Sequence, residues 1–432
     1  MKIQDILTKI NENELDGVFS ELYGNSPEAM EAQKARYIHA LEMFSSTFPG
    51  DPSREVSIFS APGRTEICGN HTDHQRGRVL AAAIDLDMIA IVSSDAENVI
   101  RIQSEGYPMI EVDIADVLPR EEEKGTTDAL VRGVVSQFGA HGVKVSGFDA
   151  YITSSVLPGS GLSSSAALEV LIGKIIDCRD NDGETGEIEI AKIGRFAENW
   201  YFGKASGLMD QTASSVGGLI EIDFKNAKEP KIDAHQYDFE KAGYSLVITN
   251  TGGSHANLSE EYSAIPKEMR SVARYFGKDY LADVDEKEFY ARISRLRKEP
   301  EISDRAILRS AHFFADNARV AMEAQALENG NIRKFLDLVN ASGESSAALL
   351  QNLYSNVIPQ DQPITLALMM SQSILRNVGA CRVHGGGFAG TIQAFVPKEK
   401  IKEYVASLEG LFGAGSCYVL HIRPKGAAKI IG

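Results

Sequence analysis

Cysteine, tryptophan and long apolar runs are scarce in this sequence of 432 residues. It has one tryptophan and four cysteines, at Cys68, Cys178, Cys381 and Cys417. Because the cysteines are far apart and form no CxxC pair, they favour reduced thiols in the cytoplasm over a disulfide framework. The most apolar stretch, residues 79–94, contains Asp85 and Asp87 and falls short of the roughly 20 apolar residues that cross a bilayer. The first residues lack the apolar segment of a secretory signal. These absences predict a soluble cytoplasmic protein.

The chain also has fewer basic than acidic residues. The chain has 44 lysines and arginines against 60 aspartates and glutamates, a net charge of −16. Such a surface repels phosphate backbones and anionic lipid heads, and the sequence contains no basic cluster to overcome this repulsion. It therefore predicts no nucleic-acid and no membrane partner, and favours small soluble ligands. With 43% hydrophobic residues, the chain can bury the cores of two or three domains, which excludes a disordered chain.

The periodicity of apolar residues changes along the chain. Helical spacing in the first fifty residues gives way to strand-like alternation around residues 56–58 and 84–92. A polar stretch at 223–230 precedes a long helical region, about 260–356, and strands near 381–383 and 392–396. The sequence predicts a mixed α/β (α+β) fold with a helical arm at 1–53, one domain at 54–222 and another at 223–432.

The strongest local signal is a glycine- and serine-rich loop between a predicted strand, 148–156, and a predicted helix that begins near 166. Its residues are Pro158, Gly159, Ser160, Gly161, Leu162, Ser163, Ser164, Ser165 and Ala166. Glycines let the backbone approach a ligand, and the following helix directs free N–H groups at an anion. We interpret the loop as a phosphate-binding site, and the alternative is a serine-capped helix after an ordinary turn. The sequence contains no G-x-x-x-x-G-K-[ST] loop, and the G-x-G-x-x-G match at 385–390 precedes a strand pattern where a dinucleotide fold requires a helix.

A second polar segment, residues 61–74, combines Arg64, Asn70, His71, Asp73 and His74 around glycines. Arginine donates hydrogen bonds, aspartate accepts them and asparagine does both, so this mixture suits the hydroxyl groups of a sugar. Two alternatives are a hydrophilic surface turn and a metal site at Cys68 and the two histidines, which would lack a fourth ligand.

Two carboxylates, Glu198 and Asp210, form the third candidate. Asp210 is followed by a run of small residues, a setting too apolar for an ordinary surface acid. Phosphoryl transfer uses one carboxylate to hold Mg²⁺ and another to orient or deprotonate the attacking hydroxyl. The alternative is that both acids lie on solvated faces.

The three segments, in this order, resemble the galactokinase family, a branch of the GHMP kinases. The resemblance covers G-R-x-x-x-x-G-x-H-x-D at 63–73, the glycine-serine loop at 158–166, M-D-Q at 209–211 and the late glycine-rich loop at 385–390. It implies two α/β domains, the second ferredoxin-like, with the active site in the cleft between them. It also implies ATP- and Mg²⁺-dependent phosphorylation of the anomeric hydroxyl of α-D-galactose.

The resemblance assigns roles residue by residue. Asp210 and Arg64 match catalytic positions, and Ser165 and Glu198 match Mg²⁺ positions. The loop at 158–166 matches the nucleotide-binding segment. Sugar-contact positions are Asn70, His71, Asp73 and, by a looser match, Tyr262.

The chain departs from the family pattern at several positions. The family has V-N where this chain has Thr65-Glu66, and G-E-H-x-D-Y where this chain has residues 69–74, with Asn70 in place of the glutamate. By the resemblance, that glutamate faces a sugar hydroxyl. Two carboxylates about 4 Å apart repel by about 4 kcal/mol at an effective dielectric constant of 20, so a glutamate at this position would exclude a uronic acid and Asn70 would not. The alternative substrates are galacturonate and N-acetylgalactosamine.

His384 replaces a threonine of the family pattern, and we expect it to be a buried structural histidine. A non-catalytic sugar sensor is the other alternative. The intact Ser163–Ala166 segment and the presence of Asp210 favour an enzyme.

Overall fold

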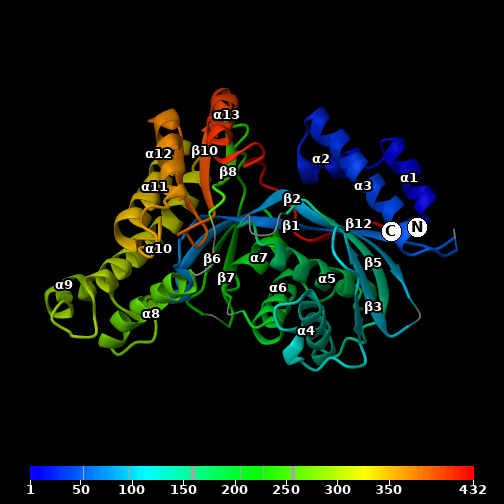
Figure 1. The fold of residues 1–432 in the computed structure, drawn as a ribbon, viewed down its shortest axis with the longest axis horizontal. Coiled ribbons are helices and arrows are strands. Elements are labelled where there is room, and N and C mark those ends of the chain that lie inside the picture. Colours follow the sequence, from blue (N-terminus) through cyan, green and yellow to red (C-terminus); the bar gives the residue numbers. More distant parts are fainter. Residues whose placement is uncertain (52, 96, 157–160, 205, 227, 254–257) are drawn as a thin grey trace.

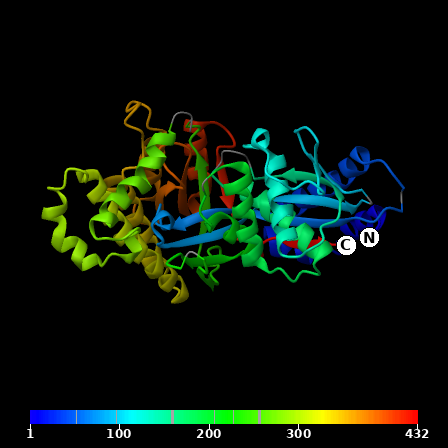
Figure 2. The ribbon, with the colours of Figure 1, turned by 90° about the horizontal axis from the view of Figure 1, so that it is seen from below.

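The computed structural model describes the chain except for residues 52, 96, 157–160, 205, 227 and 254–257. Pro158, Gly159 and Ser160 of the predicted phosphate loop therefore lie outside the described residues. The described parts form two β-sheets, each covered by helices, in an elongated molecule (Figure 2). Helices α8 and α9 lie at one end, and both chain termini lie near the other (Figures 1 and 2). The mixed α/β class predicted from the sequence is confirmed.

The first sheet has the strand order β12-β1-β2-β5-β3-β4, and β6 pairs with β2 while β7 pairs with β6. Its strands are β1 (Ser57–Cys68), β2 (Arg78–Ser94), β3 (Val99–Ser104), β4 (Ile110–Asp113), β5 (Phe148–Ser154), β6 (Leu219–Asp223), β7 (Lys231–His235) and β12 (Ala428–Ile431). The β3–β5 pair is parallel, and the others are antiparallel. Strands β1 and β2 are almost entirely buried, because helices cover both faces of the sheet.

Helices α4–α7 cover one face of this sheet and α1–α3 the other (Figure 1). The first group consists of α4 (Thr127–Ala140), α5 (Ser164–Asp180), α6 (Glu187–Phe196) and α7 (Met209–Val216), and the second of α1 (Ile3–Asn11), α2 (Asp16–Tyr23) and α3 (Pro27–Thr47). Helix α3 begins at Pro27 after a Ser26 side chain that accepts a hydrogen bond from the backbone N–H of Ala29, so its start is fixed locally. Tyr37 of α3 packs with Ile89 and Ile91 of β2 in one apolar core.

The second sheet is antiparallel, with the order β11-β8-β10-β9. It consists of β8 (Tyr244–Asn250), β9 (Ala380–His384), β10 (Thr391–Pro397) and β11 (Cys417–Leu420), and its helices are α10 (Asp304–Glu328), α11 (Ile332–Ser345), α12 (Pro363–Leu375) and α13 (Ile401–Phe412). Leu246 and Ile248 pack towards α10 and α11, whereas Val247 packs towards α12 and α13. This alternation is the period of two expected for a strand.

Two further helices and several helical turns complete the description. Helices α8 (Ser259–Tyr275) and α9 (Glu286–Leu296) form an apolar core with α10. Single turns are η1 (Asp73–Gln75), η2 (Glu121–Glu123), η4 (Leu281–Asp283) and η6 (Lys398–Lys400), and π-helical turns are η3 (Ala197–Phe202) and η5 (Ser346–Leu350). Among the described residues, no helix is both long and apolar enough to span a membrane.

The helical character of the first fifty residues, the long helical region and the two late strands are confirmed. The predicted domain boundary near residue 222 falls within β6. The chain stays in the first sheet through β7 and returns to it with β12, so sheet membership does not follow the predicted ranges. The helices of the predicted arm share a core with β1, β2 and β5.

Candidate active site

Arg64 and Asp210 form the centre of the site. Arg64 lies on β1 and Asp210 in the first turn of α7, and two guanidinium nitrogens donate to the two carboxylate oxygens, Nε to Oδ1 at 2.7 Å and Nη2 to Oδ2 at 2.8 Å. Burial acts to raise the pKa of Asp210, but the Arg64 charge and the hydrogen bonds from Arg64 and Ser163 outweigh it and hold that pKa below its usual value. The carboxylate is therefore ionised. Its side chain is 28% exposed, so it can still meet a ligand.

The glycine-serine loop lies against the same arginine. Arg64 Nη1 donates to the carbonyl oxygen of Gly161 at 2.5 Å, and the Arg64 backbone N–H donates to that of Leu162 at 3.1 Å. Ser163 has a φ of +62°, a left-handed conformation that is unusual for serine, and its hydroxyl donates to Asp210 Oδ2. Helix α5 begins at the next residue, so the unpaired N–H groups of its first turn lie beside the Arg64–Asp210 pair.

Glu198 lies on the π-helical turn η3 and faces the start of α5. Its Oε1 accepts hydrogen bonds from the Ser165 hydroxyl at 3.0 Å and from Lys204 Nζ at 2.7 Å, and its Oε2 accepts one from Gln211 Nε2 at 2.9 Å. One carboxylate and one hydroxyl on adjacent elements are oxygen donors of the kind that Mg²⁺ takes when substrate phosphates supply the other ligands. The predicted pair Ser165 and Glu198 thus fits a magnesium ion, and Lys204 shows that the carboxylate already attracts a cation.

A cavity of about 950 Å³ opens beside the start of α5. Ser164 and Ser165 line it together with Met88, Ile102 and Leu130, which come from the first sheet and α4. An apolar chamber that ends at hydroxyl groups and helix N–H groups suits a nucleotide, because the base takes the apolar part and the phosphates the polar end.

The sugar-motif turn follows β1. Asp73 lies beside the segment before α7, since a Cβ atom on Gly207 would come within 2.6 Å of Asp73 Oδ2. A side chain at position 207 would therefore displace the Asp73 carboxylate from this position. His71 donates from Nε2 to the carbonyl oxygen of Gly386 at 2.9 Å, and burial, with a smaller effect of His74, lowers the pKa of His71 to about 3. His71 is therefore neutral.

Tyr262, on α8, contacts the late glycine-rich loop, residues 385–390. Its hydroxyl donates to the carbonyl oxygen of Gly387 at 2.8 Å, and its ring makes an edge contact with Phe388. The structure thus brings His71 and Tyr262 to the same loop, residues 385–390, whereas Asp73 lies beside Gly207.

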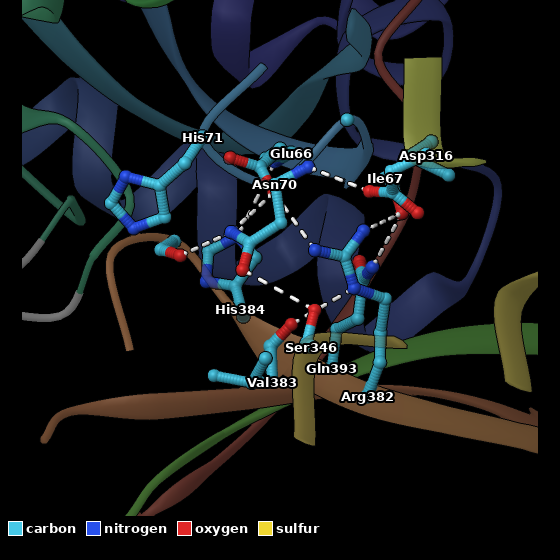
Figure 3. Close-up of polar contacts among 12 residues, drawn as sticks. Glu66, Ile67, Asn70, His71, Asp316, Ser346, Arg382, Val383, His384 and Gln393 are labelled. Carbon is cyan, nitrogen blue, oxygen red and sulfur yellow. Dashed lines mark hydrogen bonds and ion pairs between the residues drawn. The ribbon is translucent and has the colours of Figure 1, made fainter. Parts of the chain in front are cut away.

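Asn70 differs from the sequence-based expectation. Its side chain is fully buried, and its Nδ2 donates to Glu66 Oε1 at 3.0 Å (Figure 3). The same Nδ2 donates to the Gly385 carbonyl at 2.6 Å, and Asn70 Oδ1 accepts from Asn352 Nδ2 at 2.8 Å. These bonds use both amide hydrogens. The expectation that Asn70 faces a sugar hydroxyl is not met in this structure, because its amide is committed to protein partners.

His384 is buried, as expected. The backbone N–H of Glu66 donates to its Nε2 at 3.3 Å, so the ring proton is on Nδ1, which donates to Thr391 Oγ1 at 2.9 Å. Burial, together with nearby Arg64 and Arg382, holds the pKa of His384 well below its usual value. The neutral ring joins β9 to β1.

The metal alternative at Cys68, His71 and His74 has no support in the geometry. Among the residues that the structure describes, no group of three or more His, Cys, Asp and Glu side chains can hold a metal ion. Cys68 is fully buried, and burial raises the pKa of its thiol well above the usual value.

Sequence reasoning missed several residues of this site. Glu66 lies two residues before the end of β1 and Arg382 in the middle of β9, and both strands are almost entirely buried. A charged side chain within such a strand is the signal that would have found them. Glu169 is also fully buried, hydrogen-bonded to Gln211 Nε2 at 2.9 Å, and burial and the Glu198 charge raise its pKa well above the usual value. Glu169 lies in the apolar sequence of α5, and a single acid within such a sequence is a similar signal of a buried, functional carboxylate.

Comparisons with known proteins show which family the chain resembles. The galactokinase galactose-binding signature matches residues 42–94, and the GHMP kinase N-terminal domain matches residues 129–218. A galactokinase of Actinobacillus pleuropneumoniae serotype 5b (strain L20) is 32% identical over 347 residues, which cover 79% of this chain and 85% of the relative. A galactokinase of Glaesserella parasuis serovar 5 (strain SH0165) is 31% identical over 349 residues, with the same coverage.

Solved structures extend the comparison. The Lactococcus lactis galactokinase complexed with galactose has a TM-score of 0.76 and 25% identity, over 91% of this chain and all of the other. The Methanococcus jannaschii mevalonate kinase, with a TM-score of 0.60 and 17% identity over 86% of this chain and 98% of the other, shares the fold alone. The fold is that of the GHMP kinases, a class of phosphotransferases. Within this class, the chain belongs to the galactokinase family.

Proposed function

We propose that this chain transfers the γ-phosphoryl group of ATP to the anomeric hydroxyl of α-D-galactose. The observation that carries the proposal is the ionised Asp210, which Arg64 and Ser163 hold between the phosphate-binding helix start and the sugar-motif turn. A carboxylate there can meet a hydroxyl on one side while phosphates bind on the other. The galactokinase relatives support the same reaction.

Asp210 orients the anomeric hydroxyl and accepts its proton as transfer proceeds. The anomeric oxygen forms a bond to the γ-phosphorus while the bond from that phosphorus to the leaving oxygen of ADP breaks. Because Arg64 holds the pKa of Asp210 low, this carboxylate is a weak base, so orientation contributes more than early deprotonation. Arg64 also lies where it can offset negative charge as the phosphoryl group moves.

The other described residues divide between the two substrates. The N–H groups of the first turn of α5, with the hydroxyls of Ser164 and Ser165, bind the phosphates, and the apolar cavity takes the base. Ser165 and Glu198 would hold a magnesium ion, which neutralises phosphate charge when bound. On the sugar side, Asp73 accepts hydrogen bonds from hydroxyls, and the neutral His71 and the hydroxyl of Tyr262 shape the cleft.

A substrate panel tests the proposal. The full-length chain is assayed for ADP release with ATP and Mg²⁺ on galactose, N-acetylgalactosamine and galacturonate, and the product on galactose is identified as the 1-phosphate. We expect galactose to have the highest kcat/KM. Sugar binding without ADP release would indicate a sensor, and a higher kcat/KM on galacturonate would replace the proposed substrate.

Asp210→Asn is the matched control for that panel, since it keeps the shape of the side chain and removes its charge. We expect kcat on galactose to fall about 10²–10⁴-fold, because the base and orienting carboxylate are lost. Binding of ATP, followed by calorimetry, should change little. Near-normal kcat in this variant would remove Asp210 from the mechanism.

A further inference from the structure

The two carboxylate oxygens of Glu198 have different surroundings. Oε1 accepts from Ser165 Oγ at 3.0 Å and from Lys204 Nζ at 2.7 Å, whereas Oε2 accepts from Gln211 Nε2 at 2.9 Å. The Lys204 side chain is 57% exposed, so a metal ion can replace its ammonium group at Oε1. Gln211 is fully buried, so its contact with Oε2 belongs to the protein interior. One oxygen is thus available to a ligand, and the other is held by the protein.

Gln211 connects Glu198 to a second buried acid, Glu169. Its Nε2 donates to Glu169 Oε2 at 2.9 Å as well as to Glu198 Oε2. A side-chain amide nitrogen has two hydrogens, so these two contacts use both of them. Glu169 and Glu198 have only 1% and 2% of their surfaces exposed, so bulk water does not compete for either contact.

These contacts begin and end on α5. Ser165 and Glu169 are four residues apart in this helix, so they lie on one face of it. Ser165 contacts Glu198 Oε1, and Glu169 reaches Glu198 Oε2 through Gln211 of α7. Helices α5, α6 and α7 lie on the same face of the first sheet (Figure 1). The Glu198 carboxylate is therefore held at both of its oxygens from one helix.

Helix α6 packs against the buried side of this arrangement at Gly194. A Cβ atom at Gly194 would come within 3.2 Å of Glu169 Oε2 and 3.3 Å of Gln211 Cγ, which is closer than most side-chain contacts in proteins. The backbone of α6 thus limits the movement of both side chains.

The polar character of Glu169 and Gln211 is costly at this place. Glu169 Oε1 and Gln211 Oε1 are buried and have no hydrogen-bond partner among the residues that the structure describes. An unpaired buried polar atom costs about 1–3 kcal/mol, so two apolar side chains would fill this space with less loss of stability. The cost points to a role in the site rather than in the core.

We propose that Glu169 and Gln211 are positioning residues for the metal site, where Glu169 orients the Gln211 amide and the amide fixes the Glu198 carboxylate so that its Oε1 stays beside Ser165. Gln211 directly follows Asp210 in α7, so the same contacts join the metal side of the site to the proposed base. This inference rests on the proposed function, which requires the metal ion.

Nucleotide binding with and without a metal ion tests the positioning role. The proteins are the natural chain, Glu169→Met, Gln211→Met and the double variant. Calorimetry measures Kd for a non-hydrolysable ATP analogue, once as its Mn²⁺ complex and once in EDTA. We expect each single variant to raise the Kd of the Mn²⁺ complex at least about tenfold, because loss of a group that orients a metal ligand typically costs about 10–100-fold in affinity. The Kd in EDTA should stay within about threefold of the natural chain.

The double variant tests whether Glu169 acts through Gln211. We expect its Kd for the Mn²⁺ complex to lie within about threefold of that of Gln211→Met, because the second change then removes nothing more from Glu198. A double variant weakened by the product of the two single effects would overturn this order of action.

Two further variants separate positioning from stability. Burial and the Glu198 charge raise the pKa of Glu169 well above its usual value, so a glutamine is close to it in shape and in charge. Glu169→Gln keeps an oxygen that accepts from Gln211, and its Kd for the Mn²⁺ complex should stay within about threefold of the natural chain. Glu323→Met removes a buried acid of α10 in the same way, and it should change Tm but neither Kd.

An unchanged Kd of the Mn²⁺ complex in Glu169→Met or Gln211→Met would overturn the proposal. An equal rise of the Kd in EDTA would also overturn it, since that result indicates a general distortion of the site. If Glu169→Met does not fold, Gly194→Ala takes its place, because its Cβ atom displaces the same two side chains, and the same outcomes apply. Absence of ADP release on galactose in the natural chain would contradict the proposed function alone, since the binding measurements need no turnover.

Discussion

The contact between Arg64 and Asp210 shows how one side chain can determine the ionisation state of another. Burial by itself favours a neutral Asp210, and the two charge-assisted hydrogen bonds from Arg64 reverse that preference. The positive charge of Arg64 therefore keeps the Asp210 carboxylate ionised, so that it can accept a proton. Without Arg64, burial is the dominant influence on the pKa of Asp210, and it raises that pKa.

Arg64→Met should shift the acid limb of the kcat profile to higher pH. We expect a shift of at least about one pH unit, because the pKa of Asp210 rises when its counter-charge is removed. We also expect kcat at its optimum to fall, on the order of 10²-fold, because charge compensation in transfer is lost. The measurement is kcat on galactose from pH 4 to pH 8.

Arg64→Lys serves as the comparison, since it keeps the charge but not the two parallel hydrogen bonds. Its acid limb should lie between those of the natural chain and Arg64→Met. An unchanged acid limb in Arg64→Met would show that the ionisation of Asp210 does not control the rate.

The sequence identified the chemistry of single residues better than their partners. Arg64, Asp210 and Ser165 each belong to a short motif, whereas Glu198 was assigned only through the family resemblance. The structure brings Arg64 to Asp210 and Ser165 to Glu198. The motif context also suggested a sugar contact for Asn70. That contact could not be tested from the sequence, because the partners of its amide come from the far end of the chain.

At the scale of elements, α10 carries buried acids beneath the sugar-motif turn. Asp316 Oδ2 accepts from the Asn70 backbone N–H at 3.0 Å, and Asp316 Oδ1 accepts from Arg319 at 3.0 Å. Glu323, two turns further on, is fully buried, and neither of its carboxylate oxygens has a hydrogen-bond partner among the described residues. Burial raises the pKa of Glu323 to about 8. At neutral pH, α10 therefore holds Asp316 ionised and Glu323 protonated.

The stability of the Glu323→Gln variant relative to the natural chain should increase as the pH rises from 5 to 8. Over this range the folded chain keeps a proton on Glu323 that the unfolded chain releases, so the natural chain loses stability as the pH rises through the window, up to about 8. The expected relative gain is at most about 1.4 kcal/mol per pH unit, with a plateau above pH 8. The measurement is Tm against pH for both proteins.

Glu301→Gln is a control for that experiment, because Glu301 is exposed just before α10. Its Tm difference from the natural chain should not vary with pH by more than a small amount. A Glu323→Gln difference that stays constant between pH 5 and pH 8 would show that Glu323 is ionised in the folded chain.

At the scale of the whole molecule, Asp87 joins three distant parts of the chain. It lies fully buried on β2 and accepts from Arg36 of α3 at 2.5 Å, from Tyr23 of α2 at 2.6 Å and from Arg423 of the C-terminal segment at 3.0 Å. Burial acts to raise the pKa of Asp87, but the two arginines and the hydroxyl donors hold it below the usual value. The helices of the N-terminal fifty residues are thus fastened to both the central sheet and the C-terminal segment.

Asp87→Ala should destabilise the folded chain by about 3–5 kcal/mol, because it leaves the fully buried Arg423 without its carboxylate. Urea unfolding, followed by circular dichroism, measures the loss. Lys425→Ala removes the exposed pair that Lys425 forms with Glu21, between the same two parts of the chain, and should cost no more than about 1 kcal/mol. Equal losses in the two variants would contradict a special role for the buried carboxylate.

The sequence by itself determined the local chemistry and the local backbone. The strand before the glycine-serine loop, the helix after it and the residues of the sugar motif follow from spacing and residue type within short segments, because backbone preferences and hydrogen bonds to nearby groups act over a few residues. Only the tertiary structure decided which buried groups meet. Glu66 contacts Arg382 and Asn70 contacts Gly385 because the second sheet packs against the first. Asp87 contacts Arg423 because the C-terminal segment returns to the first sheet, where β12 pairs with β1. No short segment contains both members of such a pair.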